Sequence, residues 1–359
     1  MSGAIGNGFG MMPTLMRTID KLSAQNVSLT AQLSSGIAAD SYAGFGADSS
    51  AAISLQPQLD TIDAWQTNIS ASQTNLSVAQ NALSSISSMA TSLQSALTGL
   101  QSVTSPAAVA ALSSTATADL SELTSLLNTQ SNGGYVFAGS ASDQAPVTGT
   151  DLNLSSLVTG IAGAVAQVGT SGASAVESAT LAAAAGNDAA SPFSAPLSVS
   201  PSAAAALVPE VSVGSGLSVP AGMVATQGAD IAPADTAATS TGSSIRDLIR
   251  VLATVKGLAG ADSSTAQFST LLADTSNLMP AINTALANQS GSLGAQQATL
   301  TAQSSSLSDM SDALNTQLNT VMDADPTTVR TQQVALQNQL TASYNLVADE
   351  KTLSLVDYI

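Results

Sequence analysis

The sequence predicts a mainly α-helical protein, in which a long coiled-coil-like stem is built from both termini and carries an inserted β-containing, loop-rich central domain. Two observations lead to this fold class. Apolar residues recur at alternating steps of three and four over residues 62–100, and a second heptad pattern fills the C-terminal third. Between these regions, clusters of Pro and Gly interrupt the periodicity, which is typical of loops and short strands.

The strongest periodic pattern predicts one long helix in the N-terminal half. We call the row of side chains at these alternating steps of three and four the seam of the helix. Every position of this seam except Ser72 is apolar: Ile62, Trp65, Ile69, Leu76, Ala79, Leu83, Ile86, Ala90, Leu93, Leu97 and Leu100. A second helix is predicted over residues 107–130, because Pro106 suits a first helical turn and Asn132-Gly133-Gly134 is a strong stop signal. A shorter seam near the N-terminus ends at Gly36.

The C-terminal third repeats this arrangement. Heptad-spaced residues predict a long helix whose register extends back to Leu272, with Pro280, Gly291 and Gly294 as points where it kinks or breaks. The heptad positions are Leu293, Leu300, Leu307, Leu314 and Val321. Asp325 as an N-cap and Pro326 at the first helical position predict the start of a final helix.

Four regions follow from these patterns: a disordered N-terminal extension (1–14), an N-terminal helical arm (15–139), an inserted variable domain (140–244) and a C-terminal helical arm (245–359) that packs on the first. Inside the insert, short strands are predicted at 208–213 and 217–219, and helices at 154–168 and 173–185. The long seams require partners. Either the arms pack on each other and on neighbouring subunits, or all seams form a single monomeric bundle.

The charge content excludes several classes of function. Charged residues make up 9% of the chain and the net charge is −17, where soluble domains carry about 25% charged residues. No Lys or Arg lies between Lys21 and Arg246, which argues against nucleic acid and anionic membranes as partners. The chain has no His and no Cys, so catalytic triads that use His, thiolate nucleophiles and disulfides are excluded. We therefore expect no enzyme activity, no cofactor and no metal site.

Localisation is less constrained by composition. A chain without Cys suits the cytosol, and it suits equally an unfolded passage through a narrow export channel. The N-terminus has no basic segment followed by a continuous apolar one, so we expect no cleaved signal peptide. The apolar stretch at 154–168 is too short to span a bilayer, so we expect no membrane insertion.

Three motifs, taken in their order and spacing, resemble a known family. Residues 133–139 read GGYVFAG, residues 33–36 read LSSG, and the tail reads LQNQLTASY and then LSLVDYI. Together they resemble the bacterial flagellar hook-associated protein 3 family, the hook–filament junction proteins within the flagellin-like family. The resemblance covers most of residues 15–140 and 265–359. The chain departs from the family pattern at Ile37, which stands in place of a basic residue, and in the first turn, where Gly46-Ala47-Asp48 replaces an Asp-Asp-Pro turn.

The resemblance implies a structural subunit of the bacterial flagellum, an adaptor that joins hook to filament, is exported unfolded without a cleaved signal peptide, and works outside the cell. Assembly would proceed through inter-subunit packing of the terminal helices, at Leu15, Ile19, Leu22, Leu29, Leu336, Leu340, Val347, Leu353 and Leu355. Tyr135, Phe137 and Gly139 would anchor the insert to the stem. The implied partners are other copies of the chain, a neighbouring hook-associated protein, flagellin and an export chaperone.

Three other functions stay open at this point. Flagellin, the filament subunit, shares the architecture of the helical arms. A secreted adhesin or effector would use the insert to bind its target. An enzyme that relies on carboxylates alone, such as a glycosidase, would need paired acids on a rigid scaffold, and the acids of this chain are scattered.

Overall fold

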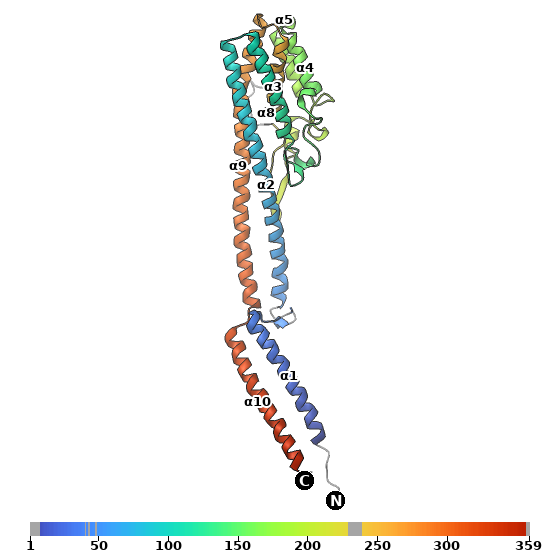
Figure 1. Ribbon diagram of the computed structural model, residues 1–359, viewed down its shortest axis with the longest axis vertical. Coiled ribbons are helices and arrows are strands. Elements are labelled where there is room, and N and C mark those ends of the chain that lie inside the picture. Colours follow the sequence, from blue (N-terminus) through green and yellow to red (C-terminus); the bar gives the residue numbers. More distant parts are fainter. Residues whose placement is uncertain (1–7, 40, 42–43, 47–48, 229–238, 357–359) are drawn as a thin grey trace. The chain divides into compact units, whose positions relative to one another are not determined.

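The computed structural model describes residues 8–39, 41, 44–46, 49–228 and 239–356, with side chains described from 13 to 349 apart from the same gaps. The chain forms two compact units (Figure 1). The first combines Met1–Asp63 with Ser308–Ile359, and the second is Ala64–Leu307. Helices α2 (Ser49–Ser102) and α9 (Ala266–Met322) contribute to both units. The predicted mainly α architecture is confirmed, since long helices dominate and the strands are short.

In the second unit, α2 and α9 form an antiparallel pair. Gln73 donates a hydrogen bond to the Thr301 hydroxyl (3.1 Å), and Asn283 donates one to Gln94 Oε1 (2.5 Å), so the two helices run in opposite directions. The predicted seam is buried from Ile69 to Leu100, Ser72 included, while Trp65 is half-buried. The seam explains the length of these helices, because helices in folded proteins owe most of their stability to such packing.

Helix α9 runs unbroken through Pro280, Gly291 and Gly294, where the sequence suggested a kink or a break. A glycine in a helix interior costs about 1 kcal/mol relative to alanine. The buried apolar residues on both sides of these positions, Met279, Ile282, Leu286 and Leu293, offset that cost by packing in the seam.

A group of shorter helices completes the second unit. These are α3 (Pro106–Leu127), α4 (Ser156–Ala166), α5 (Val168–Ser171), α6 (Ala173–Ala185), α7 (Pro201–Ala205) and α8 (Ser244–Gly257). Helix α8 lies at the centre, in contact with α3, α4 and α6, and each of its residues from Ser244 to Val255 is buried. At Gly257 a Cβ atom would lie 2.8 Å from the Ala162 Cα and from the Val165 Cβ. Glycine therefore allows the close crossing of α8 and α4.

Two short antiparallel hairpins accompany these helices. Strands β1 (Gln130–Ser131) and β2 (Gly134–Tyr135) are joined by Asn132 and Gly133, whose φ angles are 51° and 81°. Two consecutive positive φ angles define a type I′ turn, for which Asn-Gly is the preferred sequence. The helix predicted to reach residue 130 therefore ends at Leu127, because the Asn-Gly pair serves a hairpin and not the helix terminus.

The second hairpin consists of β3 (Glu210–Gly214) and β4 (Leu217–Pro220), which confirms the strands predicted inside the insert. Two glutamines of α9, one heptad apart, form hydrogen bonds with the hairpin and with the residues that follow it. Gln303 donates to the Val213 carbonyl (3.1 Å), and Gln296 Oε1 accepts from the Gly222 amide (2.8 Å). The predicted domain boundaries at 139/140 and 244/245 both fall inside the second unit.

The first unit contains the two terminal helices, α1 (Gly8–Ser35) and α10 (Pro326–Val356). They form an antiparallel pair. The segment that follows α1 is joined to the segment that precedes α10 by two backbone hydrogen bonds, from the Ala38 amide to the Met322 carbonyl (2.7 Å) and from the Ala324 amide to the Gly36 carbonyl (2.8 Å). Helix α1 begins at Gly8 and so includes residues 8–14 of the predicted N-terminal extension; residues 1–7 lie outside the described residues. Pro13, the sixth residue of α1, removes one backbone hydrogen bond and crowds the carbonyl four residues earlier, and the helix continues through it.

Asp325 caps α10, as the sequence predicts. Its Oδ1 accepts from the Thr327 amide (3.0 Å) and its Oδ2 accepts from the Thr328 hydroxyl (2.5 Å). The hydrogen bonds from the Thr328 hydroxyl and then the Thr327 amide hold the pKa of Asp325 below its usual value of 3.8. They favour the ionised form, which also suits the positive end of the helix dipole.

We expect Asp325→Ala to reduce the helix content of α10 at neutral pH. Because the pKa of Asp325 is lower in the folded protein, its stabilising contribution is complete above the usual pKa and is lost as the pH falls through the lowered one. The difference in ellipticity at 222 nm between variant and wild type should therefore shrink on acidification. Asp309→Ala, at an exposed position of α9, is the matched control and should change helix content little at either pH.

Candidate assembly interface

The residues predicted to pack between subunits lie on α1 and α10, and the structure brings them together within one chain. Ile19, Leu336 and Leu340 are buried, while the rest of the described set is half-buried: Leu15, Leu22, Leu29 and Val347. Gln333 donates to the Thr30 hydroxyl across the pair (3.0 Å). The seam thus joins α1 to α10 in the isolated subunit. The side chains of Leu353 and Leu355 lie outside the described residues.

A second set of apolar side chains on the same unit remains exposed. Val27 is 68% exposed, Tyr344 55% and Val334 53%. Most large apolar side chains that the structure shows as exposed belong to the first unit: Met16, Val27, Leu33, Ile37, Ile53, Met310, Val334, Tyr344 and Leu346. In the larger second unit the corresponding residues are Val103, Leu154 and Leu217. This concentration marks the terminal helices as a candidate interaction surface.

Met16, Val27 and Val334 lie off the buried seam, whereas Leu33 and Tyr344 continue its spacing from Leu29 and Leu340. Met16 and Val27 are eleven residues apart, about three helical turns, so they share one face of α1. Val334 precedes the buried Leu336 by two residues, about 200° around α10, and so points away from α1. Each helix therefore has apolar side chains on more than one side, which is typical of a helix that packs against more than one neighbour. Heptad spacing identifies one seam for each helix and therefore does not identify Met16, Val27 or Val334.

Several threonine hydroxyls of this surface are already satisfied within their own helices. The hydroxyls of Thr18, Thr30, Thr331 and Thr341 each donate to the carbonyl four residues earlier, at 2.8–2.9 Å. A hydroxyl bonded in this way can be covered by another subunit without leaving an unsatisfied donor. These threonines can thus be buried at low polar cost, and their methyl groups add to the apolar area.

The predicted anchor lies in the second unit, where the β1–β2 hairpin meets the loops that follow. Phe137 is fully buried and its carbonyl accepts from the Ala225 amide (2.9 Å). Gly139 has a φ of 64°, and a Cβ atom there would lie 2.5 Å from the Leu207 carbonyl oxygen and 2.8 Å from the Val224 side chain. No other residue fits at this position. Tyr135 is half-buried, and its amide donates to the Ser142 carbonyl (2.8 Å).

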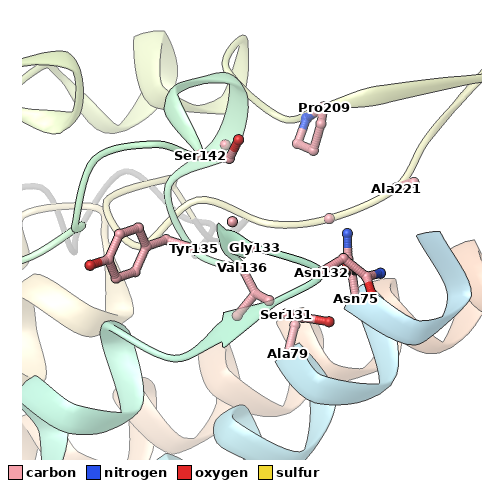
Figure 2. A pocket seen from close by; sticks show the side chains of 13 residues that line it. Asn75, Ala79, Ser131, Asn132, Gly133, Tyr135, Val136, Ser142, Pro209 and Ala221 are labelled. Atoms are coloured by element: carbon pink, nitrogen blue, oxygen red, sulfur yellow. Dashed lines mark hydrogen bonds between the residues drawn. The ribbon is translucent and has the colours of Figure 1, made fainter. Parts of the chain in front are cut away.

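Asn132 connects this motif to the long helix α2. Its Nδ2 donates to Asn75 Oδ1 (3.0 Å) and to the Ala71 carbonyl (3.3 Å). Figure 2 shows Asn132 beside Asn75 at the rim of a pocket of about 290 Å³ between α2, the hairpin and the segment around Ala221. The lining provides amides, hydroxyls and glycine backbone; it includes Asn75, Ser131, Asn132, Tyr135 and Ser142. The motif thus joins α2 to the 207–225 segment of the insert.

The described part of the chain contains no cluster of three or more His, Cys, Asp or Glu side chains with the geometry to hold a metal ion. Among the same residues, no helix combines the length and the apolar character that a bilayer crossing requires.

The N-terminal arm is similar to a known protein family. Residues 7–142 match the family model described as the bacterial flagellin N-terminal helical region. A search of curated proteins found no match. The matched residues include α1, α2, α3 and the anchor motif. The match shows that the N-terminal arm is similar to the N-terminal helical region of bacterial flagellins.

Proposed function

We propose that the chain, whose N-terminal arm is of the flagellin type, is the adaptor subunit that joins the flagellar hook to the filament. The observation that carries this proposal is the exposed apolar surface on the terminal helices α1 and α10. A subunit of a polymer needs such a surface, because burial of apolar area, at about 25 cal/mol per Å², drives association. The GGYVFAG segment at 133–139 favours the junction protein over flagellin.

The proposed partners follow from this role: other copies of the chain, a neighbouring hook-associated protein, flagellin, and an export chaperone inside the cell. In the assembly, α1 and α10 keep their mutual seam and use their exposed apolar side chains, including Val27, Val334 and Tyr344, against neighbours. The half-buried seam residues Leu15, Leu22, Leu29 and Val347, together with Leu353 and Leu355, add to these contacts. Secretion in an unfolded state suits a chain that has no Cys.

Flagellin is the second candidate, because the matched family model describes a flagellin helical region. Deletion of the gene separates the two functions. Loss of a junction protein should leave cells with hooks, without attached filaments, and with flagellin shed into the medium. Loss of flagellin should remove the filament protein itself. A deletion strain with normal attached filaments would contradict both.

A further inference from the structure

The turn of the β1–β2 hairpin carries a reactive pair of residues. Asn132 is exposed, and Gly133, which follows it, would have nothing within 4 Å of an added Cβ atom. In an Asn-Gly pair the backbone nitrogen of the glycine can approach the asparagine side-chain carbonyl without steric hindrance, because glycine has no side chain. We propose that Asn132-Gly133 is a site of spontaneous deamidation, and that docking of the hairpin on α2 protects it.

The reaction needs only water as co-reactant. The Gly133 nitrogen gives up its proton and forms a bond to Asn132 Cγ, while the bond from Cγ to Nδ2 breaks. Nδ2 leaves as ammonia, which takes up that proton, and a five-membered cyclic imide remains. Water then adds to either carbonyl carbon of the imide, and the ring opens to aspartate or to isoaspartate.

The contacts of the leaving group explain the protection. Asn132 Nδ2 is held by Asn75 Oδ1 at 3.0 Å and by the Ala71 carbonyl at 3.3 Å, both on α2. Asn132 and Gly133 are also fixed at positive φ by the type I′ turn. Because closure of the imide requires rotation of the Asn132 side chain and backbone, these bonds must open first. The reaction therefore proceeds from hairpins that have left α2.

The product cannot restore the same contact. A carboxylate offers acceptors only, and it would face two acceptors, Asn75 Oδ1 and the Ala71 carbonyl. Isoaspartate additionally inserts a backbone atom into a turn that has room for two residues. Deamidation thus turns a reversible opening of the hairpin into a permanent one, at the motif that joins α2 to the insert.

The rate of conversion at position 132 tests this in the full-length protein. Wild type in native buffer, wild type in urea, and Asn75→Ala in native buffer are incubated at mildly alkaline pH and analysed by mass spectrometry for deamidated and isoaspartyl peptides. Pepsin is the suitable protease, because no Lys or Arg lies between Leu22 and Ile245. In urea, Asn7-Gly8, the other Asn-Gly pair of the chain, serves as the reference for an unprotected site.

We expect conversion to be fastest in urea and slowest in the native wild type, with Asn75→Ala about two- to tenfold faster than the latter, the factor that one hydrogen bond provides. No conversion in urea would show that the site is unreactive. Equal rates in native buffer and in urea, or in Asn75→Ala and wild type, would show that docking gives no protection.

A second measurement tests the consequence without relying on Asn75→Ala. Asn132→Asp, which places the product side chain directly, should increase amide hydrogen exchange over residues 130–136. Asn81→Asp, at an exposed position of α2, is the matched control and should leave this exchange unchanged. If Asn132→Asp exchanges like the wild type, the carboxylate is tolerated at α2 and the proposed permanent opening is wrong.

Discussion

Arg246→Met is expected to destabilise the second unit by about 3–5 kcal/mol, since each buried acceptor left without a donor costs about 1–3 kcal/mol. The Arg246 side chain is fully buried and its guanidinium lies 5.5 Å from the centre of the Phe193 ring. Methionine fills much of the volume but donates no hydrogen bond. The acceptors that lose their donor are the carbonyls of Ala184, Gly186 and Val199 and the Asn187 side chain. The Leu197 carbonyl, a further acceptor of Arg246, keeps its hydrogen bond from the Thr226 hydroxyl (2.9 Å).

The position of these acceptors explains why a cation is placed in the core. Ala184 and Gly186 lie at the C-terminal end of α6, where the carbonyls carry the negative end of the helix dipole. Burial lowers the pKa of Arg246 while the neighbouring Asp247 raises it, and an arginine stays protonated under these conditions. The charge is therefore balanced mainly by helix-end and loop carbonyls, with Asp247 nearby.

Urea unfolding followed by circular dichroism measures the effect in the full-length chain. Arg330→Met, at an exposed position of α10, is the matched control and should change the unfolding free energy by less than about 0.5 kcal/mol. Arg246→Lys should fall between the two, because lysine keeps the charge but lacks the planar set of donors. A loss below about 1 kcal/mol for Arg246→Met would contradict the assigned role.

Helix α8 provides the cations that the long stretch between Lys21 and Arg246 lacks. The Lys and Arg residues of the second unit are Arg246, Arg250 and Lys256, all on α8. Arg250 donates to the Glu177 carbonyl (3.2 Å), and Lys256 donates to the Asn153 carbonyl (3.2 Å). The segments that precede α8 thus obtain their cations from a helix that follows them in the chain.

Sequence patterns correctly predicted those structural features that depend on residues close together in the chain. The seam of α2, the strands of the β3–β4 hairpin and the Asp325 cap depend on periodicity or on neighbours within a few residues, and the structure has them as expected. Helix α8 could not be predicted in this way. With Arg246, Asp247, Arg250 and Lys256 it has the composition of a surface helix, and it is buried because its hydrogen-bond partners come from distant segments.

The same limit applies to the candidate interface. A heptad pattern shows that Ile19 and Leu336 need an apolar partner, but it does not say whether that partner is another subunit or the other end of the chain. The structure pairs them within one chain. The exposed apolar residues carry no regular pattern of their own, so only their accessibility separates them from the seam.

Val27→Asp and Val334→Asp are each expected to abolish assembly while leaving the isolated subunit folded. Both valines are more than half exposed in the single chain, so a carboxylate there remains hydrated and the unfolding free energy should change by less than about 0.5 kcal/mol. In the assembly the same carboxylate would be buried without a partner. A penalty of about 3 kcal/mol or more per subunit weakens association by about 100-fold or more.

The measurement is the fraction of hooks that carry filaments in cells whose only copy of the gene is the variant. The amount of variant secreted into the medium is recorded to establish that export is intact. Leu154→Asp is the matched control, because Leu154 is 76% exposed but belongs to the second unit. If Leu154→Asp abolishes filament attachment and Val27→Asp and Val334→Asp do not, the contacts that build the polymer lie on the second unit and not on the terminal helices.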